Sequence, residues 1–483
     1  MYDMSMLING ENVGAGGGAT FERRNPLTGD VATRAPASTA KDAVRAVEAA
    51  HRAFPAWAAL GPGERRTLLL KAAAALEQKA PAFAEAMADE TGASGMWAGF
   101  NVHLAAGILV EAAALTTQIK GEVIPSDVPG SLAMGIRQPA GVVVGIAPWN
   151  APVILGVRAI ATPLACGNTV VLKGSELCPR THRLIIESLQ DAGLPAGVVN
   201  FVTNAPADAG MVVEAMVAHP AVRRVNFTGS TRVGKLIAQT CAKYLKPVVL
   251  ELGGKAPFVV LDDADLDAAV NAAAFGAFAN SGQICMSTER FVVDAAVADD
   301  FVAKLAAKAG ALPVGDPRKG PVVLGSVIDM ATVERCNALI DDAVAKGAKV
   351  LCGGRADSTL MAATLIDHVT PEMKIYREES FGPVKAVVRV NGVEEAIACA
   401  NDNEYGLSSA VFGRDIARAF EVAKRIESGI CHVNGPTVHD EAQMPFGGVK
   451  SSGIGRFGGL AGVNEFTDLR WITVQTTQRH YPF

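Results

Sequence analysis

Three side chains of different chemistry stand in sequence contexts that suit an enzyme site. Cys285 lies in "ANSGQICMSTER" (279–290), Glu251 lies in "PVVLEL" and Asn150 closes "APWN". A thiol can become a nucleophile, a carboxylate can act as a general base, and a side-chain amide can donate a hydrogen bond to an oxyanion. Each residue also has an ordinary interpretation, because free cysteines are commonly buried in cores and a single glutamate commonly caps an element.

The elements that must position these residues form a regular series between residues 141 and 252. Continuous Val/Ile/Leu runs, typical of fully buried strands, alternate with amphipathic helical patterns. This alternation predicts a parallel, doubly wound sheet whose ligands bind at the carboxyl ends of its strands. The predicted strands are 141–147, 169–173, 198–203, 222–229 and 247–252, and the predicted helices begin near Pro152 and cover 181–193, 206–219 and 231–244.

A second series of strands and helices predicts a second α/β domain. In this domain, a Ser-Gly turn joins the helix 265–280 to Cys285. The residues before 120, which precede both series, are mostly helical in pattern. Two stretches with β character lie outside both series, at 130–139 and 465–476. They are expected either to pair across a subunit interface or to be edge strands of their own domain, and both interpretations stay open. The second series has strands at 256–261, 290–294, 408–413 and 429–434, with helices at 265–280 and 415–428.

Two further motifs suit a dinucleotide. In "FTGSTRVGK", Gly229 ends a predicted strand, Ser230 can cap the next helix, and Gly234 allows close packing, so the helix start can receive a pyrophosphate. Lys173 and Glu176 follow another strand and suit the two hydroxyls of a ribose. A 2′-phosphate would be repelled by the glutamate, which favours NAD over NADP. Taken singly, each motif also fits an ordinary strand–helix turn or a solvated charge pair.

Composition and charge exclude several classes of protein. The 483 residues exceed one ordinary core, and 49% hydrophobic with 19% charged residues indicates a globular chain of two or three domains. A formal net charge of -5 gives no reason to expect nucleic acid or a membrane as partner. The eight cysteines lie far apart without zinc spacing, so we expect no metal site and reduced thiols. No signal peptide is apparent, so a cytoplasmic location is expected.

Two stretches resemble known motifs but lack part of what each motif requires. The uncharged run 138–157 has the length of a membrane helix, but Pro148 and Pro152 interrupt it, so a strand, a turn and a helix start are expected instead. The tract Gly14–Ala19 matches the glycine pattern of dinucleotide-binding proteins. It lacks the helix that must follow, and we expect a flexible hairpin turn there.

The motifs together resemble the aldehyde dehydrogenase superfamily over nearly the full length. Single matches are weak, but seven occur in order at compatible separations. The resemblance implies a cofactor domain of residues 1–118 and 140–251, a catalytic domain of 252–446, and a small oligomerisation arm of 119–139 and 463–483. The matching motifs are "PWN" (148–150), "VLKGSE" (171–176), "FTGS" (227–230), "LELGGK" (250–255), "GQIC" (282–285), "ESFGP" (379–383) and "PFGGVKSSGIGR" (445–456).

The resemblance also implies the role of each site residue. Cys285 attacks the aldehyde carbon, Asn150 and the Cys285 backbone N–H stabilise the oxyanion, and Glu251 activates the water that hydrolyses the thioester. The implied cofactor is NAD, and the implied assembly is a homodimer, with a tetramer as the alternative. The residues implied to line the NAD site are Trp149, Lys173, Glu176, Gly229, Ser230, Gly234, Leu252, Glu379 and Phe381.

Departures from the family pattern favour an aromatic substrate. Ala151 follows Asn150 where many members have an aromatic residue, and Trp97 can add a ring wall. Arg158 lies about two helical turns beyond Asn150 and can bring a guanidinium to the same cavity. The chain is therefore similar to the branch that oxidises salicylaldehyde, benzaldehyde and vanillin, with salicylaldehyde dehydrogenase expected as the nearest match. The alternative for Arg158 is an ion pair with an acid at a domain interface.

Two other functions remain as alternatives. An aliphatic aldehyde or semialdehyde dehydrogenase would use Arg158 for a carboxylate. A thiol esterase or hydrolase would need only Cys285 and Glu251, and it would leave the Lys173, Glu176, Gly229 and Ser230 motifs without a purpose.

Overall fold

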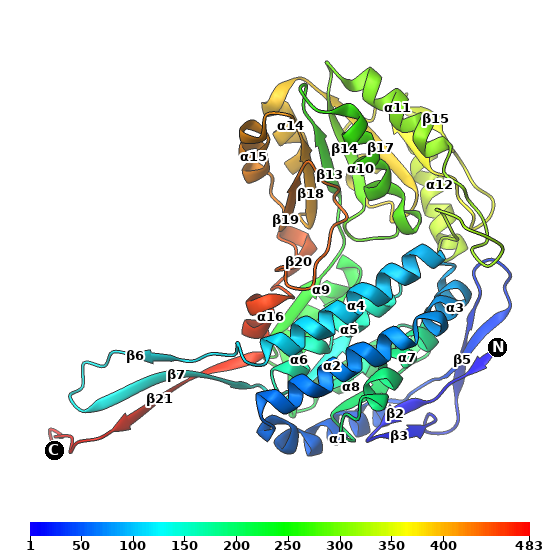
Figure 1. The fold of residues 1–483 in the computed structure, drawn as a ribbon. Coiled ribbons are helices and arrows are strands. Elements are labelled where there is room, and N and C mark those ends of the chain that lie inside the picture. The colour runs from blue at the N-terminus through cyan, green and yellow to red at the C-terminus, as the bar shows by residue number, and fades with distance from the viewer.

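The computed structural model describes residues 1–483 as two α/β lobes and a protruding arm (Figure 1). The first lobe is built on an eight-stranded sheet whose central strands β12 to β10 are parallel. All five predicted strands of this region are present. In spatial order the strands are β20 (Gly453–Ile454), β12 (Val248–Glu251), β11 (Val222–Thr228), β8 (Val142–Ile146), β9 (Thr169–Lys173), β10 (Val199–Val202), β2 (Met6–Ile8) and β3 (Glu11–Val13).

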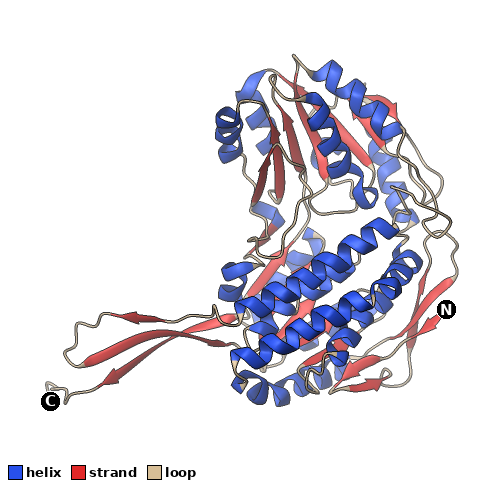
Figure 2. Cartoon of the chain, in the orientation of Figure 1, coloured by secondary structure: helices blue, strands red, loops and turns tan.

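Helices cover both faces of this sheet, as the alternation predicts (Figure 2). Successive residues of β8 point to opposite faces, so Val143 packs in one core with α2 to α7, while Val142 and Val144 pack in another with α1, α8 and α9. The helices are α1 (Ala40–Ala59), α2 (Pro62–Gln78), α3 (Ala80–Thr91), α4 (Gly95–Leu115), α5 (Pro152–Arg158), α6 (Ala161–Ala165), α7 (Pro179–Asp191), α8 (Ala209–Ala218) and α9 (Thr231–Lys243).

The apolar segments of this lobe are core elements. Helix α4 is long and apolar enough to cross a membrane, but it packs against α2, α3, α5 and α6 and is largely buried. The uncharged run 138–157 forms the end of a strand of the arm, β8, a turn and most of α5, which confirms the expected strand, turn and helix start.

The second lobe repeats the doubly wound design on a seven-stranded sheet. All neighbouring strands pair in parallel except β15 with β16, and helices pack on both faces. The spatial order is β15 (Lys349–Cys352), β16 (Thr364–Asp367), β17 (Val384–Val390), β14 (Thr288–Asp294), β13 (Ala256–Val260), β18 (Ser408–Phe412) and β19 (Ile430–Val433). The helices are α10 (Leu266–Phe278), α11 (Ala298–Gly310), α12 (Met330–Ala345), α13 (Lys374–Arg377), α14 (Gly392–Asn401) and α15 (Ile416–Arg425).

The arm is a three-stranded antiparallel sheet that projects from the first lobe (Figure 1). Its strands are β21 (Thr467–Gln475), β7 (Ser131–Pro139) and β6 (Glu122–Ile124). The two stretches with β character therefore pair with each other within one chain, from Thr467 opposite Pro139 to Gln475 opposite Ser131. This pairing leaves the outer edges of β21 and β6 without a neighbouring strand in the chain.

The N-terminal region is mostly helical, as its pattern predicts, but it also contains short strands that the sequence did not indicate. Besides β2 and β3 it contains a small sheet of β1 (Tyr2–Asp3), β5 (Val31–Pro36) and β4 (Thr20–Arg24). The tract Gly14–Ala19 joins β3 to β4 across two sheets, so it is a connection and not the expected hairpin turn. The predicted domains left residues 447–462 unassigned. These residues contribute β20 to the first sheet and include the first turn of α16 (Gly459–Glu465).

Candidate active site

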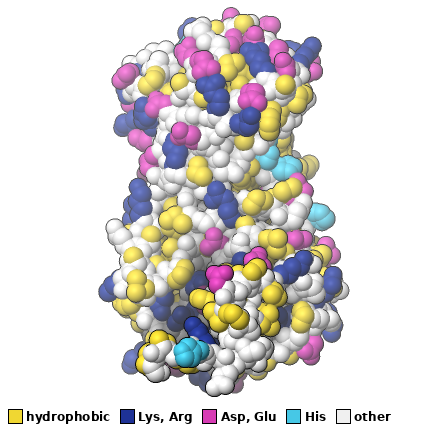
Figure 3. Space-filling model, turned by 90° about the vertical axis from the view of Figure 1, so that its left-hand side faces the viewer, with side chains coloured by type: hydrophobic (Ala, Val, Ile, Leu, Met, Phe, Trp, Pro, Cys, Tyr) yellow, Lys and Arg dark blue, Asp and Glu magenta, His cyan; other side chains and the backbone are white.

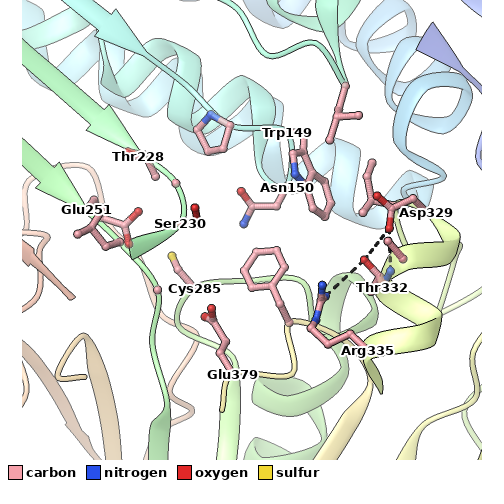
Figure 4. Close-up of a pocket in the computed structure, with 18 residues that line it drawn as sticks. Trp149, Asn150, Thr228, Ser230, Glu251, Cys285, Asp329, Thr332, Arg335 and Glu379 are labelled. Atoms are coloured by element: carbon pink, nitrogen blue, oxygen red, sulfur yellow. Dashed lines mark hydrogen bonds between the residues drawn. The ribbon is translucent and has the colours of Figure 1, made fainter. Parts of the chain in front are cut away.

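A cavity of about 400 Å³ lies between the two lobes and holds most of the predicted site residues (Figure 4). The chain passes from β12 to β13 directly beside it, so residues from both lobes reach the same space. Nine predicted residues line the cavity: Trp149, Asn150, Gly229, Ser230, Glu251, Leu252, Cys285, Glu379 and Phe381.

The carboxyl ends of the first-lobe strands bring the polar residues together. Ile146 at the end of β8 pairs with Lys173 of β9 and Phe227 of β11, and Thr228 pairs with Glu251 of β12. These ends therefore lie at one edge of the sheet, where ligands of doubly wound sheets bind. The turn after β8 carries Asn150 from that edge into the cavity.

Cys285 reaches the cavity from the second lobe through a strained turn after α10. Asn280 and Ser281 have φ values of 49° and 55°, in the left-handed region that non-glycine residues seldom adopt. Gly282 follows at φ 72°, and a Cβ there would lie 2.3 Å from the Gly382 carbonyl oxygen. All eight cysteines are free thiols, and Cys285 is one of three that are not fully buried. A reactive role suits Cys285 because it faces the cavity.

Asn150 is held in place by hydrogen bonds on both its side chain and its backbone. Its Nδ2 donates to the Gln283 carbonyl at 3.0 Å, and its own carbonyl accepts from Trp97 Nε1 at 2.9 Å and Asn280 Nδ2 at 3.0 Å. The amide thus connects the two lobes beside Cys285. Trp97 does not line the cavity, contrary to the expectation of a ring wall; it lies behind Asn150 and orients it.

Glu251 and Cys285 face each other, and each changes the acid strength of the other. Glu251 is 1% exposed and both of its carboxylate oxygens lack a hydrogen-bond partner. Burial raises the pKa of Glu251 to about 8, although the neighbouring thiol and Arg158 oppose this shift. Burial, and then the Glu251 carboxyl, raise the pKa of Cys285 well above its ordinary value. Both groups therefore hold their protons more tightly than usual, and Glu251 loses its proton at a lower pH than Cys285 does.

The remaining cavity residues form a wall suited to a nucleotide. Ser230 Oγ accepts from Val233 N at 3.4 Å and so caps α9, whose start faces the cavity. Gly234 lies under Leu252, because a Cβ at Gly234 would be 2.3 Å from Leu252 Cδ2. Lys173 and Glu176 form a 2.8 Å ion pair just outside the lining, next to Leu177, and Lys173 helps lower the pKa of Glu176 against the effect of burial.

Glu379 and Phe381 close the second-lobe side of the cavity. The Glu379 Oε1 accepts from the Gly254 N–H at 2.9 Å, and burial raises the pKa of Glu379 to about 7. The Phe381 ring meets Trp149 edge to face at a centroid distance of 5.8 Å, so both aromatic residues narrow the same part of the cavity.

Arg158 does not present the free guanidinium that its predicted substrate role requires. Its Nη2 donates to Asp440 Oδ2 at 2.6 Å, both side chains are buried, and the guanidinium lies 4.3 Å from the Phe446 ring centroid. The ion pair is the alternative that the sequence left open, although the partner was unknown. Neither Arg158 nor Ala151 lines the main cavity.

Sequence reasoning missed one whole wall of the cavity. Ile328, Asp329 and Thr332, with Ala331 and Arg335, enter it from the start of α12. The available signal was Asp329 as a helix cap, since its carboxylate accepts from Thr332 N at 2.8 Å. That signal predicts where a helix begins but not that its first turns reach the site. Pro148, Leu177, Thr228 and Gly253 complete the lining.

The fold is an α/β structure of two doubly wound lobes, with the candidate site in the cavity between them. A family model described as the aldehyde dehydrogenase family matches residues 13–472, and the chain belongs to that family. This confirms the family resemblance and the fold class that the motifs imply.

Named relatives and a solved structure match the chain at full length or nearly so. A vanillin dehydrogenase of Pseudomonas fluorescens is 62% identical over 100% of both chains. A crystal structure of a salicylaldehyde dehydrogenase from Pseudomonas putida G7, complexed with salicylaldehyde, is 51% identical with a TM-score of 0.99 and 100% coverage of both chains. A benzaldehyde dehydrogenase [NAD(+)] of Pseudomonas putida is 40% identical over 95% of this chain and 94% of that protein. The expected nearest match, salicylaldehyde dehydrogenase, is therefore less similar than a vanillin dehydrogenase.

Proposed function

We propose that the protein oxidises an aromatic aldehyde to its carboxylate with NAD. The observation that carries the proposal is the meeting of Cys285, Asn150 and Glu251 in one cavity beside the start of α9. The aromatic class is supported by the vanillin, salicylaldehyde and benzaldehyde dehydrogenases to which the chain is similar. Vanillin is the first candidate because the vanillin dehydrogenase has the highest identity of these three.

The side chains suit covalent catalysis through a thioester. The Cys285 sulfur bonds to the aldehyde carbon after its proton passes to water. The free Asn150 Nδ2 hydrogen and the Cys285 N–H stabilise the oxyanion, and the bound cofactor supplies a hydride acceptor. Glu251 then takes a proton from water, whose oxygen attacks the thioester carbon and releases the carboxylic acid and the thiol.

The residues present fit NAD. The capped start of α9 suits a pyrophosphate, and Glu379 and Phe381 suit the nicotinamide ribose and ring. Glu176 already accepts hydrogen bonds from Lys173 and from Asn204 Nδ2 at 3.0 Å, and its lowered pKa keeps it charged. A charged acceptor suits a ribose 2′-hydroxyl and disfavours a 2′-phosphate, so the preference for NAD rests on this group.

An aldehyde panel with NAD tests the proposal. We expect the highest kcat/KM on vanillin, salicylaldehyde or benzaldehyde, and a loss of at least about 10³-fold in Cys285→Ser. Higher kcat/KM on succinic semialdehyde would favour the aliphatic alternative. Hydrolysis of 4-nitrophenyl acetate without any NAD binding or aldehyde oxidation would favour the thiol hydrolase.

We further propose that the arm joins two copies of the chain into a homodimer, with a tetramer as the alternative. Figure 3, which faces the side from which the arm projects, shows hydrophobic side chains gathered over the lower half of this view. Trp471 is 78% exposed and Val123 is 72% exposed. Exposed apolar side chains beside unpaired strand edges are typical of an interface between chains.

A further inference from the structure

A fully buried charge cluster lies behind the second-lobe wall of the cavity. It consists of Glu289 on β14, Lys255 beside β13 and Lys385 on β17, whose side chains are 2%, 0% and 0% exposed. Lys255 Nζ donates to Glu289 Oε2 at 2.8 Å, and Lys385 Nζ donates to Glu289 Oε1 at 2.7 Å. None of the three lines the cavity, and the proposed chemistry does not use them.

The cluster is bonded to the chain on both sides of Glu379. Glu289 accepts from the Ser380 backbone N–H at 2.8 Å and from the Ser380 hydroxyl at 2.6 Å. Lys255 donates to the Glu378 carbonyl at 2.7 Å, immediately before Glu379. Phe381, which directly follows Ser380, has a φ of 42°. Such a left-handed conformation is unfavourable for an aromatic residue and persists only where neighbouring contacts enforce it.

The electrostatics of the cluster fit a fixed anion at its centre. Burial alone would raise the pKa of Glu289, but the ammonium groups of Lys255 and Lys385 outweigh it and lower the pKa to about 2. Both carboxylate oxygens carry two donors each, so the side chain has no freedom to turn. A buried ion cluster is a poor source of stability compared with apolar packing, which points to a role in holding a specific geometry.

We propose that Glu289 is a positioning residue that acts through Ser380 to fix Glu379 and Phe381 at the cofactor wall. The inference rests on the proposed NAD-dependent function. Cofactor binding can be separated from the chemistry of the thiol, because the hydrogen bonds of Cys285 and Asn150 do not involve Ser380. Loss of the Glu289 contact should therefore weaken cofactor binding and oxidation more than it weakens the chemistry of the thiol.

Glu289→Gln and Ser380→Ala test the proposal against the control Asp367→Asn. Asp367 is also buried in the same sheet and bonds to Arg389 Nη2 at 2.8 Å, but it lies away from the cavity. We measure NAD binding by intrinsic fluorescence quenching, KM for NAD, and NAD-independent hydrolysis of 4-nitrophenyl acetate. Both site variants should raise the Kd and KM for NAD at least about tenfold, as expected for loss of a charge-assisted hydrogen bond, and change ester hydrolysis less than about threefold. The control should keep the wild-type Kd despite a lower Tm.

The outcomes separate this inference from the proposed function. Wild-type protein that neither binds NAD nor oxidises aldehydes overturns both. Active wild type with an unchanged Kd in the folded variants overturns the positioning role alone, as does an equal loss of oxidation and ester hydrolysis. If Glu289→Gln does not fold, Ser380→Ala decides, because it removes one hydroxyl and leaves the three charges paired.

Discussion

At the scale of single residues, the Glu251–Cys285 pair determines the pH dependence. With a pKa of about 8, Glu251 is mostly protonated at neutral pH and must lose its proton to activate water. We expect steady-state oxidation to rise about tenfold per pH unit below about 8 and then to level off. Glu251→Gln should keep a pre-steady-state burst of NADH but lose most steady-state turnover. A burst that disappears with the steady-state rate would place Glu251 in the acylation step instead.

The same shift has an effect on stability with a definite sign. The pKa of Glu251 is higher in the folded chain than its ordinary 4.5, so the folded state binds more protons between these values. The contribution to the free energy of unfolding therefore falls as pH rises from about 4.5 to about 8. Urea unfolding of Glu251→Gln should show a smaller decrease over this range than wild type.

The Arg158–Asp440 pair predicts a difference between single and double replacements. Arg158→Met leaves the Asp440 carboxylate buried without a partner and should cost about 3–5 kcal/mol of unfolding free energy. The double variant Arg158→Met/Asp440→Leu should recover most of this loss. If the pair contacts the substrate, the double variant should also lose the preference for vanillin over benzaldehyde. An unchanged preference in this stable variant would make the pair purely structural.

At the scale of elements, the packing of α9 under Leu252 predicts an effect on the cofactor site. A methyl group at Gly234 would meet the Leu252 side chain, which lines the cavity, so Gly234→Ala should shift that wall and raise the KM for NAD severalfold. Gly210→Ala in α8 is the matched control, because its added Cβ meets nothing within 4 Å. The control should keep the KM and gain slight stability from the better helix former. Equal KM values in both variants would contradict the prediction.

The elements show which parts of the structure a sequence can specify. The strands β8 and β9 were predictable because each buries a continuous apolar run. The short strands β3 and β4 were missed because "ENV" and "TFERR" contain no such run and lie near the surface.

The residues of the site also differ in how well the sequence predicts them. Cys285, Glu251 and Asn150 belong to local motifs and could be found in the sequence. The partner of Arg158 is 282 residues distant, and Ser380 is 91 residues from Glu289, so only the folded chain reveals those bonds.

At the scale of the whole molecule, the arm predicts how copies of the chain associate. Trp471→Glu places a charge on the exposed face of β21 and should shift the mass measured by light scattering toward a monomer. Ile416→Glu on α15 is the control, since Ile416 is also an exposed apolar residue at 58% but lies on the other lobe. The control should keep the wild-type mass. A Trp471→Glu protein of unchanged mass would exclude the arm as the interface.

The two lobes each contribute one half of the Cys285–Glu251 pair, and this division has a mechanical consequence. The carboxyl ends a strand of one lobe, whereas the sulfur follows a helix of the other, and the backbone links them through residues 252–255 and 434–452. A slight hinge-like loosening would separate sulfur from carboxyl while every sheet stayed intact. Mild denaturant should therefore abolish turnover before circular dichroism detects any loss of secondary structure, so turnover reports on the alignment of the two lobes.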